Sequence, residues 1–434
     1  MTNTMIEQQP KYESYKDSGV EWLGEIPSEW NLLPGFRFFT ENKRSNKGMI
    51  EETVLSLSYG KIIVKPKEKL VGLVPESFET YQIVEPGDII VRCTDLQNDK
   101  VSLRTGLALN DGIITSAYLN LKVANDCEPR YLHYFLHSLD TTKVIYKFGS
   151  GLRQNLSYLD FKRLPVFDIS QNVQRAIADF LDIKTAQIDE AIAIKQKQIE
   201  QLKERKQIII QQAVTQGLNP DAPMKDSGVD WIGEIPEHWG IVRFKNLFTQ
   251  SRLPVRKGDG VVTSYRDGQV TLRSNRRVGG YTEAILEGGY QGIRKGQLVL
   301  NSMDAFEGAI GVSDSDGKCT PEYVICDPIN SVDVSQYYFA YLLREMALAK
   351  YIQVICNAVR QRAVRIRYNN LAPLFMVVPP VKEQEDIVSF IEKESTKLDA
   401  GTKHLNEQIS KLKEYKTTLI NSVVTGKIKV TELA

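Results

Sequence analysis

The feature that most constrains this fold is a long internal repeat. Residues 16–27 read KDSGVEWLGEIP and residues 225–236 read KDSGVDWIGEIP, so ten of twelve positions are identical. A second match pairs QRAIADFLDIKTAQIDEAI at 174–192 with QEDIVSFIEKESTKLDAGT at 384–402. The offsets are 225 − 16 = 209 and 384 − 174 = 210, which nearly agree. A whole half of the chain is therefore duplicated, rather than one motif.

Both halves have the same predicted plan, a globular portion followed by a long helix. The globular portions cover about 12–165 and 221–378, and the helices about 171–215 and 381–425. Short β-like runs interrupted by glycine and proline turns predict an α+β fold with a twisted, mostly antiparallel or mixed sheet. These runs are Val54–Leu57, Ile62–Lys65, Asp88–Val91, Val261–Ser264 and Gln297–Asn301. The predicted division of the chain is 1–165, 166–220, 221–378 and 379–434.

The two predicted helices carry apolar residues at spacings that are sums of three and four, as in a coiled coil. The residues expected to pair the helices are Ile188, Ile192, Ile199, Leu202 and Ile209 in the first, and Leu398, Leu405, Ile409, Leu412 and Leu419 in the second. Because a globular domain interrupts them, we expect the helices to pair antiparallel, with pseudo-two-fold symmetry, and to separate the two globular domains. At ~1.5 Å per residue each helix is roughly 65–70 Å long.

Two lysines occupy equivalent positions of the apolar seams. Lys206 and Lys416 either select one register of the helix pair or extend their ammonium groups from the seam into water. The sequence slightly favours the second interpretation.

The overall charge of +1 conceals a basic segment. From Arg243 to Lys295 the chain has eleven basic residues and four acidic ones. A dedicated nucleic-acid-binding domain is usually basic throughout, so the net charge alone does not indicate such a function. The local excess of positive charge in this segment does indicate nucleic-acid binding.

No targeting or cofactor signal is found. The first twelve residues lack an apolar signal core, and no apolar run is long enough to cross a bilayer, so we expect a cytoplasmic protein. The five cysteines form no Cys-x-x-Cys pair, which argues against a zinc site and a disulfide framework and favours free, buried thiols.

Catalytic motifs are also not found. The Gly-Lys pairs at 60–61, 317–318 and 426–427 lack the rest of a phosphate-binding loop. Neither a dinucleotide-binding glycine motif nor a Gly-x-Ser-x-Gly elbow occurs. The chain is therefore predicted to be non-catalytic, without a metal or cofactor of its own.

Basic and polar clusters form the candidate DNA-binding surface. Arg360, Arg362, Arg365 and Arg367 lie within eight residues with no acidic residue among them, a pattern suited to phosphate or to a solvated basic loop. We favour nucleic acid. The corresponding first-half segment contains Arg153, Gln154 and Asn155, side-chain types that can read guanine and adenine edges.

The remaining candidates lie where the halves keep their framework but exchange polar residues. This pattern fits two similar heads that read different base sequences, and it equally fits surface drift. The first-half set is Arg44, Lys47, Ser58, Tyr59, Lys61, Arg92, Thr94, Arg104, Arg153, Gln154 and Asn155. The second-half set is Arg256, Ser264, Tyr265, Arg266, Arg273, Arg276, Arg277, Asn301, Ser302, Asp304, Arg360, Gln361, Arg362 and Arg365.

The repeated motif itself is predicted to be structural. Its tryptophans could stack on bases, but apolar aromatics beside Ile-Pro more often pack a core. These tryptophans are Trp22, Trp30, Trp231 and Trp239. Asp17 and Asp226 are interpreted as turn or helix caps.

With these motifs in view, the whole chain resembles the specificity subunit of Type I restriction-modification systems. The resemblance rests on the KDSGV repeats, on QRAIADFLD and QEDIVSFIE at the helix starts, and on the endings QQAVTQG and NSVVTGK. It implies that 1–165 and 221–378 are target-recognition domains, each reading one half of a bipartite, asymmetric DNA target. It also implies that 166–220 and 379–434 are spacer helices that dock modification subunits.

The resemblance further implies the partners. Two modification subunits would bind S-adenosylmethionine and methylate adenine, and two restriction subunits with ATP, Mg and nuclease activity could join them. The modification subunits could also supply much of the phosphate contact, which fits the near-neutral charge of this chain. Two other functions stay open: a coiled-coil scaffold that binds only proteins, and a self-contained nuclease or methyltransferase, which would need a site that the sequence does not show.

Overall fold

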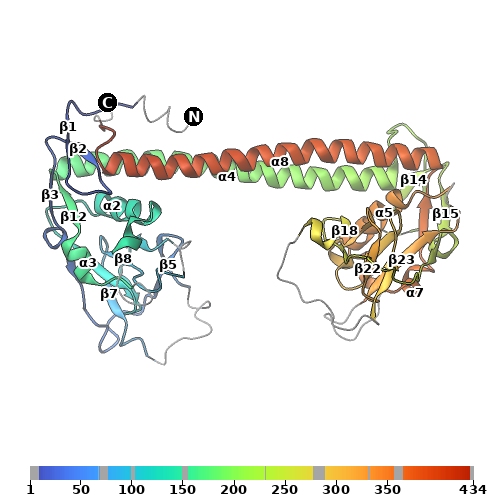
Figure 1. Ribbon diagram of the computed structural model, residues 1–434, viewed down its shortest axis with the longest axis horizontal. Helices are drawn as coiled ribbons and strands as arrows, with labels where there is room; N and C mark the ends of the chain where they lie inside the picture. The colour runs from blue at the N-terminus through green and yellow to red at the C-terminus, as the bar shows by residue number, and fades with distance from the viewer. Residues whose placement is uncertain are drawn as a thin grey trace. The chain divides into compact units, whose positions relative to one another are not determined.

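The chain forms two compact units in a computed structural model (Figure 1). The structure describes residues 9–66, 68, 77–98, 103–148, 155–229, 231–276, 289–330, 333–355 and 365–430. The first unit is Met1–Gln196 together with Leu405–Ala434, and the second unit is Lys197–His404. Each unit thus combines a globular head with the beginning of one long helix and the end of the other.

The head of the first unit is built on a four-stranded antiparallel sheet. Its strand order is β4 (Phe39–Glu41), β11 (Leu119–Val123), β8 (Ile89–Val91) and β9 (Thr105–Leu107). Two antiparallel pairs extend this head, β7 (Gln82–Val84) with β10 (Gly112–Ile114), and β3 (Asn31–Pro34) with β12 (Pro165–Asp168). Val91 and Ile89 of the central strand are fully buried, as expected for a strand covered on its apolar side.

The second unit repeats this topology strand for strand. Its four-stranded sheet has the order β16 (Phe248–Gln250), β23 (Tyr323–Pro328), β20 (Leu298–Asn301) and β21 (Ile310–Val312). The extending pairs are β19 (Gln291–Ile293) with β22 (Gly317–Cys319), and β15 (Gly240–Arg243) with β24 (Phe375–Val378). The predicted α+β class and the predominantly antiparallel pairing are confirmed.

The repeated motif forms a small hairpin in each unit. These hairpins are β1 (Tyr15–Asp17) with β2 (Glu25–Pro27), and β13 (Met224–Asp226) with β14 (Glu234–Pro236). The Asp17 carboxylate accepts a hydrogen bond from the Gly19 amide at 3.0 Å, and Asp226 accepts one from Gly228 at 2.9 Å. Both glycines have positive φ, +69° and +62°, a conformation that a side chain would disfavour. The prediction that these aspartates cap turns is confirmed.

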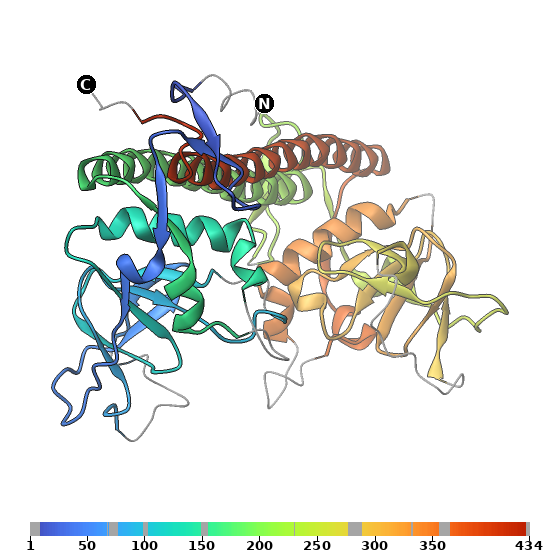
Figure 2. The same ribbon diagram turned by 60° about the vertical axis from the view of Figure 1, so that its left-hand side comes forward.

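The tryptophans of the motif pack into the cores, as predicted. Trp30 and Trp239 are 2% and 1% exposed, and Trp22 and Trp231 are partly buried against the same clusters. In the first unit the core also includes Leu419 and Val423 from the end of a long helix. Figure 2 shows the blue β1–β2 hairpin beside the red C-terminal end of that helix.

The long helices are α4 (Gln171–Gln216) and α8 (Val381–Val424), within a residue of the predicted bounds. They run antiparallel in each unit, since the start of α4 packs on the end of α8 in the first unit and the reverse holds in the second. All ten predicted seam residues are buried or half-buried, whereas Ile183, Ile194 and Ile208 on other faces are 45–53% exposed. The spacing of apolar residues therefore predicted the packed face correctly.

The two seam lysines form equivalent ion pairs across the helices. Lys206 Nζ lies 2.7 Å from an Asp399 carboxylate oxygen, and Lys416 Nζ lies 2.7 Å from Asp189. Both partners obey the repeat, since 416 − 206 = 210 and 399 − 189 = 210. A lysine that only extends into water needs no such partner, so the ion pairs favour the register-setting interpretation over the one that the sequence slightly favoured.

Reversing one charge of such a pair is expected to destabilise the helix pair in this register. Lys206→Glu places two carboxylates together, and we expect a loss of about 1 kcal/mol in the free energy of unfolding, because the pair is largely solvated. Adding Asp399→Lys should restore most of it, as measured by urea denaturation. The Lys416→Glu and Asp189→Lys variants provide the same cycle in the first unit. A double variant as unstable as its single parents would show that the pair does not set the register.

One helix in each head attaches the sheet to the long helices. These are α2 (Pro129–Thr141) and α5 (Gln336–Leu348), which in Figure 1 lie between the sheet and the helix pair of their units. The Tyr131 hydroxyl donates to the Val424 carbonyl at 3.5 Å, and the Tyr338 hydroxyl donates to the Val214 carbonyl at 2.8 Å. Each head is thereby fixed to the end of one long helix by an equivalent contact.

Among the described residues, no helix is both long and apolar enough to pass through a membrane, and no group of three or more His, Cys, Asp or Glu side chains is arranged to hold a metal. Cys93, Cys127, Cys319 and Cys326 are free and buried, as predicted, and Cys356 lies outside the described residues.

Candidate nucleic-acid interface

A hairpin in the second unit brings together several of the predicted binding residues. It consists of β17 (Val262–Ser264) and β18 (Val270–Leu272). At its turn, the guanidinium of Arg276 lies 4.1 Å from the centre of the Tyr265 ring and 2.8 Å from the Asp267 carboxylate. The turn therefore presents a cation stacked on an aromatic ring, an arrangement that can also bind a base or a phosphate.

The hairpin faces the residues that follow β20. Arg266 Nη2 donates to an Asp304 carboxylate oxygen at 3.0 Å, and the same guanidinium is paired with Glu307 of the 3₁₀ helix η7 (Ala305–Glu307). Asn301 donates to Asp304 at 3.1 Å. Arg266, Asn301 and Asp304 line an open cavity of about 380 Å³. The sequence named Arg266, Asn301 and Asp304 separately among the second-half candidates, and the fold brings them together around one cavity.

A second polar cavity of about 300 Å³ lies beside the arginine-rich segment. Arg252, Ser302, Glu322, Arg365 and Arg367 are among its lining residues. Arg365 Nη1 is 2.6 Å from the Glu322 carboxylate. The sequence had indicated that the arginines of this run lack acidic partners, and for Arg365 that is wrong because the partner comes from a distant strand end. Arg360, Gln361 and Arg362 lie outside the described residues.

The hairpin turn is attached to the rest of its unit through α5. Arg344 Nη2 donates to the carbonyl of Arg266 at 3.0 Å, and the next residue, Glu345, accepts a hydrogen bond from Gln207 of α4. Burial raises the pKa of the Glu345 carboxyl to about 7, against the hydrogen bond from Gln207, which lowers it. A chain of contacts thus runs from the long helix to the hairpin turn.

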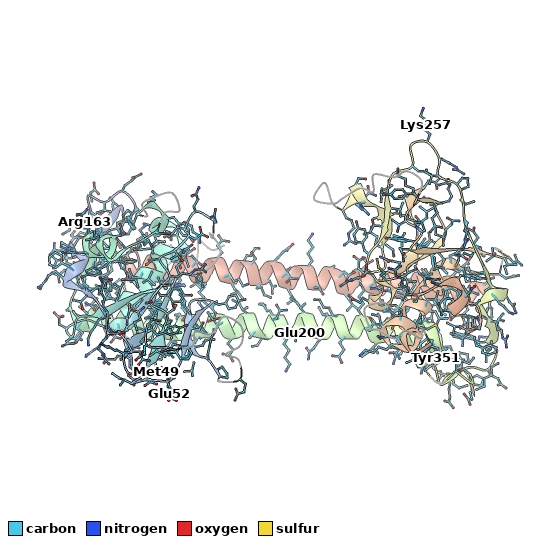
Figure 3. The ribbon with its side chains drawn as sticks, turned by 90° about the horizontal axis from the view of Figure 1, so that it is seen from below. Met49, Glu52, Arg163, Glu200, Lys257 and Tyr351 are labelled. Carbon is cyan, nitrogen blue, oxygen red and sulfur yellow. The ribbon has the colours of Figure 1, made fainter. Side chains whose placement is uncertain are left out.

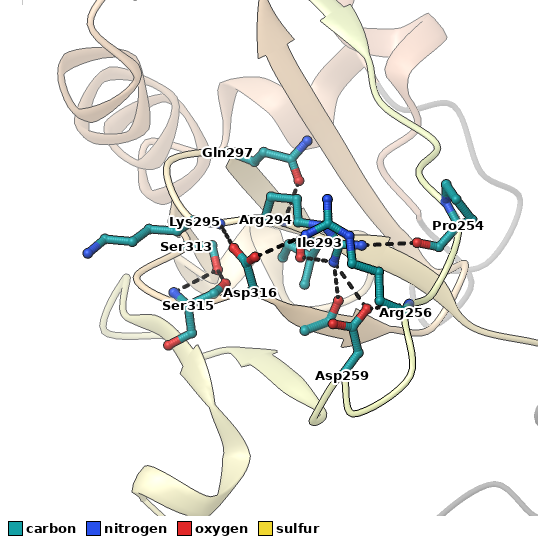
Figure 4. Close-up of polar contacts among 11 residues, drawn as sticks. Pro254, Arg256, Asp259, Ile293, Arg294, Lys295, Gln297, Ser313, Ser315 and Asp316 are labelled. Carbon is teal, nitrogen blue, oxygen red and sulfur yellow. Dashed lines mark hydrogen bonds and ion pairs between the residues drawn. The ribbon is translucent and has the colours of Figure 1, made fainter.

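A third cluster holds a loop against this head (Figure 4). Arg294 Nη1 is 3.1 Å from the Asp259 carboxylate, and both side chains are nearly buried. Nearby, Arg256 is 3.4 Å from Asp316 and its side chain is 64% exposed. Lys257 projects from the tip of the same loop (Figure 3). Arg294 is therefore structural, whereas Arg256 and Lys257 are accessible to a ligand.

The corresponding hairpin of the first unit ends in a fully exposed tyrosine. It is formed by β5 (Leu55–Ser58) and β6 (Lys61–Val64), joined by Tyr59 and Gly60. Tyr59 is 93% exposed and has a φ of +48°, a left-handed conformation that is costly for a bulky residue. Exposed Lys61 follows it. An aromatic ring held out in this way, beside a cation, is suited to stack on a base.

The prediction that Arg104 contacts DNA is wrong. Its side chain is fully buried. Its guanidinium donates to the carbonyls of Arg92 (3.3 Å), Thr94 (2.8 Å) and Asp95 (3.2 Å), and Nε donates to the Tyr146 hydroxyl at 3.1 Å. Arg104 instead fixes the loop that carries Arg92 and Thr94, two other predicted contacts.

Other first-unit candidates lie at the surface. Arg44 and Lys47 are exposed, and Arg44 Nη1 lies 2.5 Å from Glu85 Oε1. Hydrogen bonds from Arg44 and Lys122 lower the pKa of Glu85. Asn155 is exposed, and its side-chain oxygen accepts from the Asp95 amide at 2.9 Å, next to Thr94. Arg153 and Gln154 lie outside the described residues.

The remaining second-unit candidates occupy different depths. Ser264, Asn301 and Ser302 are 3%, 7% and 5% exposed, so they form cavity floors rather than projecting contacts. Arg273 is half-buried, and its Nε donates to the Thr263 hydroxyl at 3.2 Å. Arg277 lies outside the described residues. A direct role of these residues in DNA binding stays a prediction.

Sequence reasoning missed the carboxylates that bind the arginines. Glu322 is 365 − 322 = 43 residues from its partner, and Asp316 is 316 − 256 = 60 residues from its partner. Such separations leave no periodic signal in a sequence, so only the folded sheet reveals them. Among its described residues, the first half has no equivalent of these two ion pairs, so the repeat could not be used to predict them either.

A larger cavity of about 560 Å³ lies in the first unit between α2, the β5–β6 turn and the helix pair. His133 and His137 of α2 line it. Burial lowers the pKa of His133 to about 3 and that of His137 to about 4, so both are neutral at physiological pH. Their Nε2 and Nδ1 atoms, respectively, have no hydrogen-bond partner among the described residues. Nothing in the sequence had indicated this cavity.

These features define a class of protein: a two-headed, non-identical repeat in which equivalent hairpins present different polar side chains. Solved structures show the same fold. One, from a study of complex assembly and conformational transition of the type I R-M system, has a TM-score of 0.65 at 12% identity and covers 92% of this chain and 98% of its own. Another, the HsdS subunit from Thermoanaerobacter tengcongensis, has a TM-score of 0.51 at 14% identity, with 93% and 98% covered.

No family model and no curated protein matches the sequence. At the level of the fold, the resemblance stated from the sequence is confirmed, because a structure from a type I R-M system and an HsdS subunit share this fold over nearly the whole chain.

Proposed function

We propose that this chain is the specificity subunit of a Type I restriction-modification system and reads DNA sequence without catalysing a reaction. Each head would read one half of a bipartite, asymmetric target, and the antiparallel helices would set the spacing between the halves. Two modification subunits would dock on the helices and methylate adenine.

The observation that carries this proposal is that the same fold occurs twice in the chain, with different polar side chains at equivalent places. The first unit presents Tyr59 and Lys61 at its hairpin, whereas the second presents Tyr265, Arg266 and Arg276 in the equivalent place. Direct readout of DNA depends on which donors, acceptors and cations approach the bases. Two such surfaces on one framework suit two different half-sites, as the shared fold with specificity subunits supports.

The chemistry would come from the partners. S-adenosylmethionine would bind the modification subunits, and ATP and Mg would bind restriction subunits where these are present. Adenine flipped out of the duplex would be methylated there. This chain would recognise the DNA sequence through its heads and would bind the modification subunits through α4 and α8.

Methylation mapping tests the proposal. The chain would be expressed with its cognate modification subunit, with and without exchange of residues 12–165 for the head of a related chain. A split, adenine-methylated motif is expected, and the exchange should change only one half of it. If the complex forms but no motif appears, the chain is a protein-binding scaffold and the proposed DNA contacts fail.

Tyr59→Gly is expected to separate stability from binding. Glycine relieves the left-handed strain, so the free energy of unfolding should stay the same or rise by up to about 1 kcal/mol. Loss of a stacking ring should weaken target affinity by about five- to tenfold or more. Urea denaturation and fluorescence anisotropy with target duplex measure the two effects. Leu109→Ala, which removes another exposed apolar side chain of this unit, is the control. Unchanged affinity of Tyr59→Gly would exclude stacking.

A further inference from the structure

Arginines of the second head that are suited to bind phosphate are already bound to carboxylates. Arg266 is paired with Asp304 and Glu307, and Arg365 is paired with Glu322. Arg256 and Arg276 are similarly paired with Asp316 and Asp267. Except for Asp267, which lies in the hairpin turn just before Arg276, these carboxylates are distant in the sequence, so the fold brings them to the arginines.

The pairs lie where a ligand can reach them. The side chains of Arg266 and Asp304 are 62% and 39% exposed, and those of Arg365 and Glu322 are 45% and 40% exposed. Each pair lines one of the two cavities of this head described above. A solvated ion pair is weak, so a phosphate can displace the carboxylate from the guanidinium.

Displacement nevertheless opposes the binding of DNA. A phosphate that takes the guanidinium leaves a carboxylate beside the DNA backbone, where the two negative charges repel each other. Binding to random DNA depends almost entirely on such phosphate contacts, whereas a target also offers base contacts. Where base contacts hold the head on its target without phosphate contacts from these arginines, the carboxylates weaken binding to random DNA more than binding to the target.

We propose that Glu322, and Asp304 with Glu307, are specificity-determining residues that keep Arg365 and Arg266 from binding random DNA. The inference rests on the proposed function. It also explains how a head with an excess of arginine and lysine can belong to a chain of net charge +1. Each carboxylate acts through its arginine and is a positioning residue.

The test uses the full chain assembled with its modification subunits. Anisotropy titrations over a series of salt concentrations compare two duplexes of equal length, one with the motif found by methylation mapping and one with that motif scrambled. Glu322→Gln is expected to raise affinity for the scrambled duplex by about three- to tenfold and to steepen its salt dependence by up to about one unit of slope. Target affinity should change by less than about threefold. The Asp304→Asn/Glu307→Gln pair should behave likewise.

Two controls define the mechanism. Glu237→Gln removes an exposed carboxylate of the same unit that has no arginine partner among the described residues, and it should change neither affinity. Glu322→Gln combined with Arg365→Gln should lose the gain seen with Glu322→Gln alone, because the freed arginine is its cause.

The outcomes are distinct. If Glu322→Gln leaves the scrambled duplex unaffected, or if target affinity falls instead, the carboxylate does not restrain Arg365 and the inference fails. If the wild-type assembly binds both duplexes equally, the proposed function itself fails.

Discussion

Replacing Trp239 by alanine is expected to lower the free energy of unfolding by about 3–5 kcal/mol, the usual cost of emptying a buried aromatic site. Trp239 is 1% exposed and packs with its ring edge toward Tyr338, with centroids 6.5 Å apart. Tyr338 in turn binds the Val214 carbonyl of α4. The cavity would therefore loosen both the motif hairpin and the joint between α5 and the long helix.

Trp239→Phe provides the matched control. The buried indole Nε1 has no hydrogen-bond partner among the described residues, so removing it costs no hydrogen bond. We expect a loss smaller than about half that of the alanine variant. Hydrogen exchange read by mass spectrometry should show faster exchange across the second unit and little change in the first. Equal exchange throughout both units would show that the units unfold as one body.

The two units are expected to respond to pH in opposite directions. In the first unit, burial lowers the pKa of His133 and His137 from 6.5 to about 3 and 4. The unfolded chain then binds more protons, so stability is lost as the pH falls from about 6.5 toward 4. In the second unit, burial raises the pKa of Glu345 from 4.5 to about 7. The folded chain then binds the extra proton, so stability is lost as the pH rises from 4.5 through 7.

The neighbouring charges agree with the direction for the histidines, whereas at Glu345 the Arg344 cation opposes the rise in pKa and burial outweighs it. The histidines face a cavity whose walls contain Lys61, Lys413 and Lys416 as well as Asp182 and Asp189. Asp182 and Asp189 are already bound, to Arg130 and to Lys416 respectively, which leaves little negative charge to stabilise an imidazolium. Glu345 faces Gln207, which can hydrogen-bond with the protonated carboxyl as well, and both Gln207 and Arg344 lower the pKa of Glu345, so burial alone causes its rise.

Variants separate the two responses. Glu345→Gln keeps a partner for Gln207 and should stabilise the second unit by about 1–3 kcal/mol at pH 8, with little effect at pH 4.5. His133→Gln with His137→Gln should reduce the acid sensitivity of the first unit. Hydrogen exchange at pH 5, 6.5 and 8, corrected for intrinsic rates, reports each unit separately. A first unit that becomes more stable at pH 5 would contradict the burial of neutral histidines.

The sequence predicted those features that are local or periodic. The spacing of Ile188, Ile199 and Leu419 identified the packed face of the helices, and the repeat identified two equivalent heads. The helix bounds and the strands tested, such as Leu298–Asn301, agree to within about a residue. These features follow from side-chain periodicity and turn residues, which a sequence displays directly.

Features that depend on distant partners could not be predicted. Arg104 has the composition of an exposed basic residue, and only the fold shows the Tyr146 hydroxyl and the three carbonyls around it. The ion pair of Arg365 with Glu322 and the cavity beside His133 depend on tertiary contacts in the same way. The prediction of DNA contacts from arginine content alone therefore included both structural and accessible residues.

One pair of equivalent positions in the two heads limits where recombination can join their sequences. Glu85 in the first head and Arg294 in the second occupy the same repeat position, since 294 − 85 = 209, yet they bind loops of opposite charge through Arg44 and Asp259. A genetic crossover that joins the two halves of the chain inside a head would set Arg44 against Arg294, or Asp259 against Glu85. Crossovers in the long helices leave both pairs intact. Exchange of sequence between the two halves of this chain should therefore proceed by whole heads, with break points in α4 and α8.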